Sequence, residues 1–174
     1  MELAVGGRYG EREAAGSETA VKTGRTRRAA YHEAGHAVVA WALNLPIGEM
    51  RLAKGDEGVQ IGRADHLTVI EQLAICYAGL AAGDLSGDPE AAGEGTLDIR
   101  MTTKILVWAN LTRGSPAFCE ELRRQSGTLA ETIVRRHEEM VARLAARLLV
   151  SDLSVAEVAE ILDLSSRRPQ TQLQ

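Results

Sequence analysis

Apolar residues in this chain recur mostly three and four positions apart, the spacing at which side chains share one face of an α-helix. This spacing predicts five helices, over residues 26–43, 68–82, 96–111, 128–150 and 155–162. Two short apolar stretches, 50–52 and 59–61, lie between the first two helices and flank a Lys-Gly-Asp-Glu-Gly segment that is typical of a turn. We therefore expect a mainly α fold with a small β-hairpin between the first two helices.

The ends of these helices are indicated by residues that start or stop a helix. Pro46 cannot continue the first helix, because proline lacks the backbone N–H that a helix interior needs. Thr68–Glu71 and Thr128–Glu131 both match the Thr-x-x-Glu capping box, which predicts a helix start at each place. The Gly-Ser-Pro segment at 114–116 predicts a break after the third helix.

Helical spacing also predicts which side chains are buried. One face of the third helix is expected to enter the core, namely Leu97, Met101, Ile105 and Trp108. Trp41 on the first helix is expected in the core as well. His137 shares a face with apolar residues of the fourth helix and is expected to be a hydrogen-bonded core histidine.

Composition divides the chain into three parts. Residues 1–24 contain five glycines and little periodicity, which predicts a flexible leader. Residues 25–164 carry the helical pattern and are expected to form one domain, followed by a polar tail over residues 165–174.

The overall composition is that of an ordinary globular protein, with 45% hydrophobic and 25% charged residues. A net charge of −4 gives no argument for binding to nucleic acid or a membrane surface. No apolar run approaches the roughly 18 residues that span a bilayer. Cys76 and Cys119 form no Cys-x-x-Cys motif, which favours buried, reduced thiols. We therefore expect a cytoplasmic protein with no membrane span and no nucleic-acid partner.

The strongest chemical signal is an H-E-x-x-H motif in the first helix, formed by His32, Glu33 and His36. Residues four apart lie on one helix face about 6 Å apart, so both imidazoles can bind one metal ion. Glu33 then lies beside the ion, where it can take a proton from a metal-bound water. Zinc lowers the pKa of that water from about 15.7 to about 7. The motif therefore predicts a zinc site for peptide hydrolysis, with Glu33 as the general base.

A catalytic zinc needs a third protein ligand. Ala42 occupies the position at which a metzincin has its third histidine, so that class is excluded. The remaining candidates along the chain are His66, Asp84, Asp88, Glu90, Glu94, Asp98 and His137. A rigid element holds a ligand better than a loop does. This favours Asp98 in the first turn of the third helix, with Glu94 as a weaker option, and we expect His66 to face solvent.

The sequence around the motif resembles a known family. Residues 30–39, Ala-Tyr-His-Glu-Ala-Gly-His-Ala-Val-Val, look like the active-site helix of the FtsH-type zinc peptidase domain. Residues 97–103, Leu-Asp-Ile-Arg-Met-Thr-Thr, resemble the start of the family's downstream helix, in which an Asp is the third zinc ligand. The resemblance therefore points to Asp98 as the partner of His32 and His36.

Two further segments, 77–84 and 135–162, are similar to the family, so the likeness covers roughly residues 27–164. It implies a zincin-like helical peptidase domain and a zinc metalloendopeptidase acting on unfolded proteins or peptides. Leu80 and Gly83 replace an Arg and a Glu of the family, so the support that those charges give to the site is absent or rebuilt here.

Family members couple this domain to an ATPase and work as hexameric rings. The chain contains no Gly-x-x-x-x-Gly-Lys-[Ser/Thr] phosphate-binding motif. We therefore expect a stand-alone peptidase that forms homo-oligomers or receives substrates from a separate ATPase.

Two other functions stay open. The altered residues favour a catalytically weak or inactive zinc-binding module that acts through protein binding. The minor alternative is a DNA-binding regulator, with residues 153–162 as half of a helix-turn-helix, but Pro169 and the short tail leave no room for a recognition helix. The arginines at 25, 27 and 28 are too few for an electrostatic footprint and are expected to be solvated.

Overall fold

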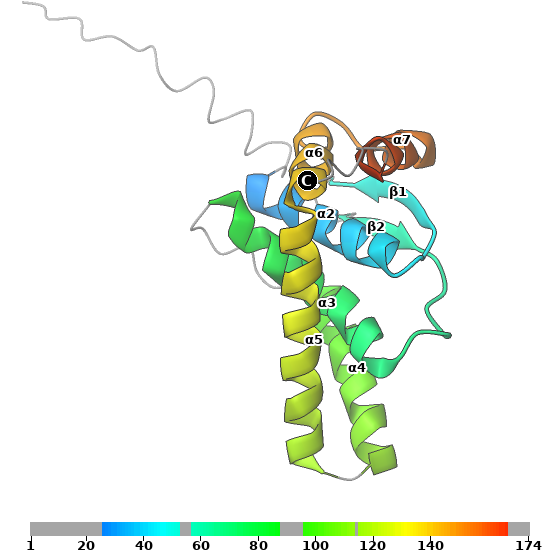
Figure 1. Ribbon diagram of the computed structural model, residues 1–174, viewed down its shortest axis with the longest axis vertical. Coiled ribbons are helices and arrows are strands. Elements are labelled where there is room, and N and C mark those ends of the chain that lie inside the picture. Colours follow the sequence, from blue (N-terminus) through cyan, green and yellow to red (C-terminus); the bar gives the residue numbers. More distant parts are fainter. Residues whose placement is uncertain (1–25, 53–56, 88–95, 114, 167–174) are drawn as a thin grey trace, which may run out of the picture.

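Helix α2 lies at the centre of the fold, with α3, α6 and the hairpin packed around it (Figure 1). The computed structural model describes residues 26–52, 57–87, 96–113 and 115–166. The elements in these ranges are α2 (Arg27–Ala42), β1 (Ile47–Arg51), β2 (Gly58–Ile61), α3 (Val69–Gly83), the 3-10 turn η1 (Asp84–Ser86), α4 (Thr96–Arg113), α5 (Pro116–Arg136), α6 (Glu138–Leu148) and α7 (Val155–Ser166). The prediction of a mainly α fold with a hairpin after the first helix is confirmed.

Both ends of α2 are fixed by local hydrogen bonds. At its start the Thr26 hydroxyl accepts a hydrogen bond of 3.1 Å from the Ala29 N–H, as an N-cap residue does. At its end Asn44 takes a left-handed conformation with φ 62°, and the Leu45 N–H donates to the Ala40 carbonyl at 3.0 Å. This is the Schellman arrangement, so the helix stops at an asparagine before the chain reaches proline.

The hairpin joins the N-terminal and C-terminal parts of the fold. Strands β1 and β2 are antiparallel, with Met50 opposite Val59. On its other side Met50 exchanges two backbone hydrogen bonds with Leu153, at 3.0 and 2.8 Å. The Leu52 N–H also donates to the Asp152 carboxylate at 3.0 Å. These bonds fix the segment between α6 and α7 against the hairpin.

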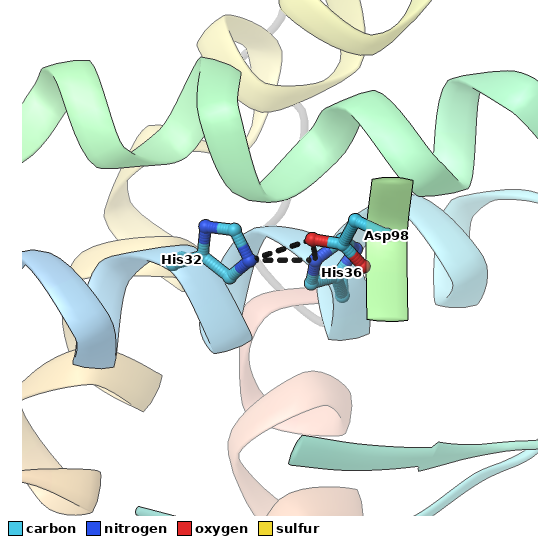
Figure 2. Close-up of side chains that lie close together, drawn as sticks. All are labelled: His32, His36 and Asp98. Carbon is cyan, nitrogen blue, oxygen red and sulfur yellow. Dashed lines mark hydrogen bonds and ion pairs between the residues drawn. The ribbon is translucent and has the colours of Figure 1, made fainter. Parts of the chain in front are cut away.

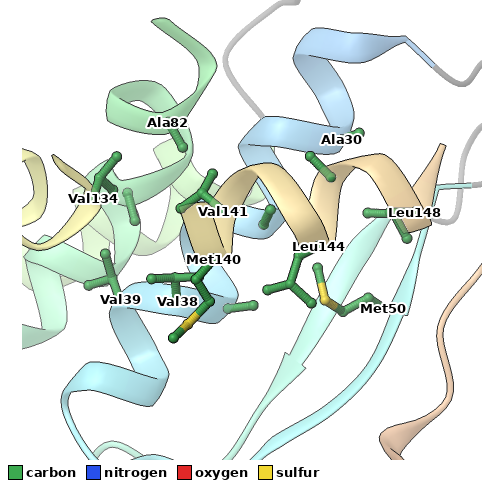
Figure 3. Close-up of a cluster of buried hydrophobic side chains, with 14 of the residues drawn as sticks. Ala30, Val38, Val39, Met50, Ala82, Val134, Met140, Val141, Leu144 and Leu148 are labelled. Carbon is green, nitrogen blue, oxygen red and sulfur yellow. The ribbon is translucent and has the colours of Figure 1, made fainter. Parts of the chain in front are cut away.

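The main core forms where α2 meets α6 and the hairpin (Figure 3). Every residue of α2 from Ala34 to Ala40 is buried. The side chains that surround this stretch are mostly aliphatic and fully buried, among them Met50, Leu52, Val134, Val141, Leu144, Leu148 and Val158. The H-E-x-x-H helix is therefore enclosed by core on most of its circumference, which makes it a rigid platform for a site.

A second, smaller apolar cluster holds α4 against α3 and α5. Its buried members are Leu73, Leu106, Ala109, Cys119 and Leu122. The predicted inner face of α4 is confirmed in part for Ile105, which is partly buried against this cluster. It is wrong for Met101, which is 47% exposed, and for Trp108, which is 59% exposed. Apolar residues occur at helical spacing on more than one face of α4, and periodicity alone does not say which face turns inward.

The predicted helix over residues 128–150 is also wrong in its bounds. Helix α5 already begins at Pro116, a residue suited to the first turn of a helix. Thr128 lies in the middle of α5, where its hydroxyl donates to the Arg124 carbonyl at 2.9 Å instead of capping a helix. The helix then breaks at His137, with φ −116° and ψ 28°, and α6 starts at the next residue.

The break leaves His137 half-buried at a corner of the fold. Its ring meets the half-buried Trp41 edge to face, with centroids 5.4 Å apart. Burial, together with the nearby Arg136, lowers the pKa of the imidazole below its ordinary value. Within the described residues its side chain makes no hydrogen bond, so the predicted hydrogen-bonded core histidine is replaced by an aromatic contact.

The remaining predictions concern the chain ends and membranes. Helix α7 continues to Ser166, so the first two residues of the predicted polar tail are helical. The predicted leader over residues 1–24 and the rest of the tail lie outside the described residues. None of the described helices is both long and apolar enough to cross a membrane.

Helices α2 and α3 approach each other closely through small residues. A Cβ added at Gly35 would lie 2.5 Å from the Ala78 carbonyl oxygen and 2.5 Å from the Ala82 Cβ. Real Cβ atoms essentially never come this close to other heavy atoms, so a larger residue at position 35 would separate the two helices.

Gly35→Ala is expected to lower the free energy of unfolding by about 1–3 kcal/mol, because the new methyl meets backbone that cannot move without disturbing the core. Gly127→Ala is the matched control, since Gly127 lies inside α5 and a Cβ there has no neighbour within 4 Å. This control is expected to raise the free energy of unfolding by about 0.4–1 kcal/mol. Urea denaturation of both variants measures the difference, and equal effects would rule out the close approach.

Candidate metal centre

Three side chains from two helices converge on one point in the structure (Figure 2). His32 Nε2 lies 2.8 Å from Asp98 Oδ2, His36 Nε2 lies 3.0 Å from the same oxygen, and the two Nε2 atoms are 3.1 Å apart. Within the described parts of the chain, this is the one cluster of three histidine, cysteine or acidic side chains with atoms close enough to hold a metal ion. The sequence-predicted ligands are thus brought together.

The dimensions of this triangle suit a small divalent cation. A tetrahedral site with bonds of about 2.0–2.1 Å has ligand atoms about 3.3–3.4 Å apart. The three observed separations are only a few tenths of an ångström shorter. The His32–His36–Asp98 group could therefore hold a metal ion with a small outward movement of its ligand atoms.

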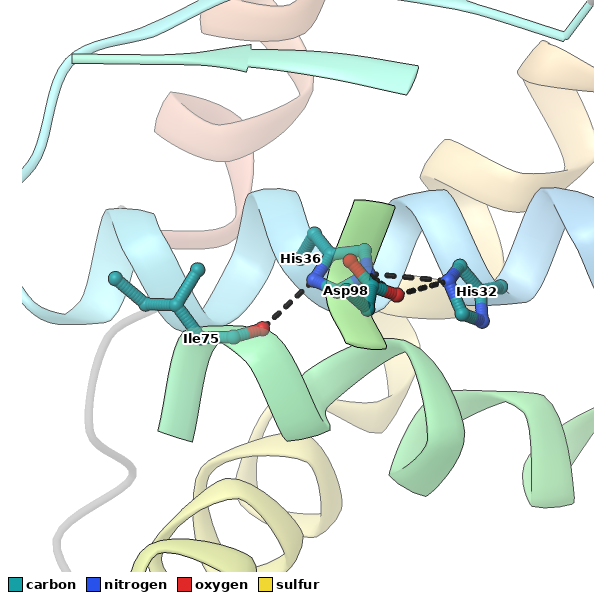
Figure 4. Close-up of polar contacts among 4 residues, drawn as sticks. All are labelled: His32, His36, Ile75 and Asp98. Atoms are coloured by element: carbon teal, nitrogen blue, oxygen red, sulfur yellow. Dashed lines mark hydrogen bonds and ion pairs between the residues drawn. The ribbon is translucent and has the colours of Figure 1, made fainter. Parts of the chain in front are cut away.

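His36 is oriented by the backbone of α3 (Figure 4). Its Nδ1–H donates to the Ile75 carbonyl at 2.7 Å. Because Nδ1 keeps this hydrogen, Nε2 is the nitrogen that can bind an ion once it has lost its own proton. A metal-binding histidine commonly has such a partner on its other nitrogen, and the partner fixes both the tautomer and the ring orientation.

The contacts between α2 and α3 repeat every four residues. His36 meets Ile75, His32 lies against Gly79, and Arg28 lies against Gly83. Each step of four residues back along α2 is matched by a step of four residues forward along α3. The two helices are therefore antiparallel, and residues spaced four apart on one helix face residues spaced four apart on the other. The histidine spacing of the motif therefore coincides with the turn spacing of the helix that supports it.

Asp98 reaches the site from the first turn of α4. One turn further along α4, Thr102 makes a side-chain hydrogen bond with Cys76 of α3. Burial raises the pKa of the Cys76 thiol above its ordinary value. Cys76 is half-buried and Cys119 is buried, and neither forms a disulfide, in agreement with the prediction for Cys119 and in part for Cys76.

The carboxylate of Asp98 and the imidazole of His36 stabilise each other's charged forms. Burial alone would raise the pKa of Asp98, but the hydrogen bonds from His32 and His36 outweigh it and hold this pKa well below its ordinary value. Burial opposes the charged form of His36, yet its hydrogen bond with Asp98 raises its pKa overall. The site thus favours an ionised Asp98, which is the form that binds a cation.

Glu33 has a different environment although it is next to His32 in the sequence. Its side chain is partly buried, and burial is the largest influence on its pKa. Burial raises the pKa of Glu33 above its ordinary value, while the neighbouring histidines act in the opposite direction. The centre therefore contains two carboxyl groups whose pKa values are shifted apart.

The other candidate ligands do not take part in this cluster. Asp84 is 73% exposed and pairs with Arg28 at 3.5 Å, and His66 is exposed as predicted. His137 lies against Trp41 instead. The acidic candidates at positions 88, 90 and 94 lie outside the described residues.

Sequence reasoning missed residues at the contact between α2 and α3. Arg28, expected to be solvated, donates to the Gly83 carbonyl at 3.4 Å and pairs with Asp84, which connects the start of α2 to the end of α3. Gly79 and Gly83 stand four residues apart in a helix, and that spacing is the signal that could have indicated a close helix contact.

A scan against protein-family models and a search of curated proteins found no match to this chain.

Asp98→Ala is expected to weaken zinc binding by more than the 10–100-fold that loss of a ligand's supporting partner typically costs, because it removes one of three ligands. Asp84→Ala is the matched control, since it removes an aspartate that pairs with Arg28 at the surface. Metal content after dialysis and titration against a chromophoric chelator measure both variants. Wild-type affinity in Asp98→Ala would exclude Asp98 as a ligand.

Proposed function

We propose that this chain is a zinc-dependent metallopeptidase in which His32, His36 and Asp98 hold the ion and Glu33 is the general base. The observation that carries the proposal is the convergence of His32 Nε2, His36 Nε2 and Asp98 Oδ2 to within 3.1 Å of one another. Two of these atoms belong to the histidines of the H-E-x-x-H motif. The glutamate of the same motif, Glu33, is suited to base catalysis.

The ligand set supports a catalytic site over a structural one. Structural zinc sites usually have four protein ligands and are rich in cysteine, whereas catalytic sites have three and leave a position open. Cys76 is absent from the group of ligand atoms. The site also borders solvent, because the Asp98 side chain is 27% exposed and that of His32 is 18% exposed.

Two histidines and one carboxylate also bind iron(II) in oxygenases. Glu33 favours hydrolysis, because an acid–base group next to the ligands is what proton transfer to and from a water nucleophile requires. Zinc bound here would supply Lewis-acid activation of the water and of the scissile carbonyl. Metal analysis of the purified protein distinguishes the two metals directly.

The chain's own residues then carry out the proton transfers. Glu33 takes a proton from the attacking water and passes it to the nitrogen of the scissile bond. This nitrogen then leaves as a neutral amine and not as an amide anion, which is a poor leaving group. The hydrogen bond to Ile75 holds His36 in one tautomer during this cycle. The rigid, buried remainder of α2 keeps Glu33 and the two histidines in fixed relative positions.

The resemblance to the FtsH-type peptidase domain supports the same reaction and a zincin-like fold. It also suggests the substrate class, since peptidases of this type cleave unfolded segments. We propose extended peptides and unstructured proteins as substrates.

Glu33→Gln is expected to lower kcat/KM for cleavage of an unstructured protein such as casein by about 10²–10⁴-fold, because the general base is lost. Zinc content should stay at the wild-type level, since Glu33 is not among the ligands. Glu131→Gln, the same change at an exposed position on α5, is the control and is expected to leave the rate unchanged.

Two results would reject the proposal. Full activity in Glu33→Gln would show that another residue or a contaminating protease performs the cleavage. A wild-type protein that binds zinc but cleaves neither casein nor short peptides would favour the alternative of a zinc-binding module that acts through protein binding.

A further inference from the structure

Helix α3 supports the two histidines of the motif in two different ways. His36 is held by its hydrogen bond to the Ile75 carbonyl. The Nδ1 of His32 has no hydrogen-bond partner among the described residues, and its ring lies instead against the backbone of Gly79. A Cβ added at Gly79 would lie 2.5 Å from His32 Cε1, 2.5 Å from Nε2 and 2.6 Å from Nδ1. Because these three distances are nearly equal, the ring presents its face to this position.

We propose that Gly79 is a positioning residue for the metal ligand His32. The missing side chain at position 79 lets the imidazole lie flat on α3, where its Nε2 reaches both His36 Nε2 and Asp98 Oδ2. A hydrogen bond orients one histidine and a steric surface orients the other. The inference rests on the metal centre proposed above and adds a residue that binds no metal.

The space available explains why a methyl group would matter. Ordinary van der Waals contact begins at 3.4 Å, so an alanine at position 79 requires the His32 ring to move by about 1 Å. Metal–ligand distances in proteins vary by only about 0.2 Å. The ring borders solvent, with 18% of the side chain exposed, so it can swing outward without opening the core. The cost of the methyl therefore falls more on metal binding than on folding.

The same helix offers a matched control. Gly83 lies one turn after Gly79 in the row that faces α2, and it too is buried. A Cβ at Gly83 would lie 3.5 Å from the nearest atom, the Arg28 Cζ, which is an ordinary contact. Gly83→Ala thus makes the same chemical change on the same face of α3, but without a clash.

The first test measures zinc affinity by competition with a chromophoric chelator in the wild type, Gly79→Ala and Gly83→Ala. Gly79→Ala is expected to bind zinc 10–100-fold more weakly, and Gly83→Ala is expected to match the wild type. With Co²⁺ in place of zinc, the visible absorption bands should change in Gly79→Ala alone, because they report the geometry of the ligands.

The second test needs no metal. In metal-free protein, Gly79→Ala is introduced with His32 present and with His32→Ala. Gly79→Ala should raise the midpoint of thermal unfolding more in the His32→Ala background than in the presence of His32. Alanine favours the helix in both backgrounds, but in the first no imidazole ring has to be displaced. Equal changes in the two backgrounds would show that the ring and position 79 do not interact, and would overturn the inference.

The outcomes separate this inference from the proposed function. Wild-type protein that binds zinc, together with a Gly79→Ala variant of equal affinity, overturns the role of Gly79 and leaves the metal centre intact. Equal losses of affinity in Gly79→Ala and Gly83→Ala would also overturn it, because the cause would then be α3 as a whole. Wild-type protein that binds no metal rejects the proposed function itself.

Discussion

The close antiparallel packing of α2 against α3 is the constraint on which the rest of this structure depends. Gly35 allows the two backbones to approach so closely that a single methyl group there would meet the carbonyl of Ala78. At that distance the register of the two helices is fixed, because small residues and larger groups alternate along the contact. The register in turn decides which atoms of α3 face the two histidines of α2.

The candidate metal centre is therefore a product of three helices, although only two of them supply ligands. Helix α2 contributes the histidines, α4 contributes Asp98, and α3 lies against both and orients the rings. The small cluster around Leu73 and Leu106 holds α4 in place. The position of Asp98 relative to the histidines therefore depends on the packing of α4 as well as on contacts within the candidate site.

Local signals in the sequence predicted much of this architecture, and long-range packing accounts for the errors. The capping box at Thr68 needs only neighbouring residues, and the structure contains it. The four-residue spacing of His32 and His36 likewise predicts that the two rings lie close together, and their Nε2 atoms are 3.1 Å apart. Asp98 is predicted mainly by the family resemblance, since no local pattern says that the first turn of α4 lies beside α2. The outward position of Trp108 and the break at His137 depend on how helices pack together, which periodicity cannot report.

The glycines of α2 and α3 show how closely the fold and the candidate site are linked. Glycine inside a helix is less stable than alanine by about 0.5–1 kcal/mol, and Gly127 in α5 carries this cost with no contact in return. Gly35 has a role in the helix contact, where nothing larger fits. At Gly79 the atoms nearest to the missing Cβ belong to the ring of His32, a member of the candidate metal centre, and not to the core. Proteins depart from local stability rules mainly where function requires it. Position 79 is thus the place where the close contact of α2 with α3 meets the proposed requirement for one orientation of the His32 ring.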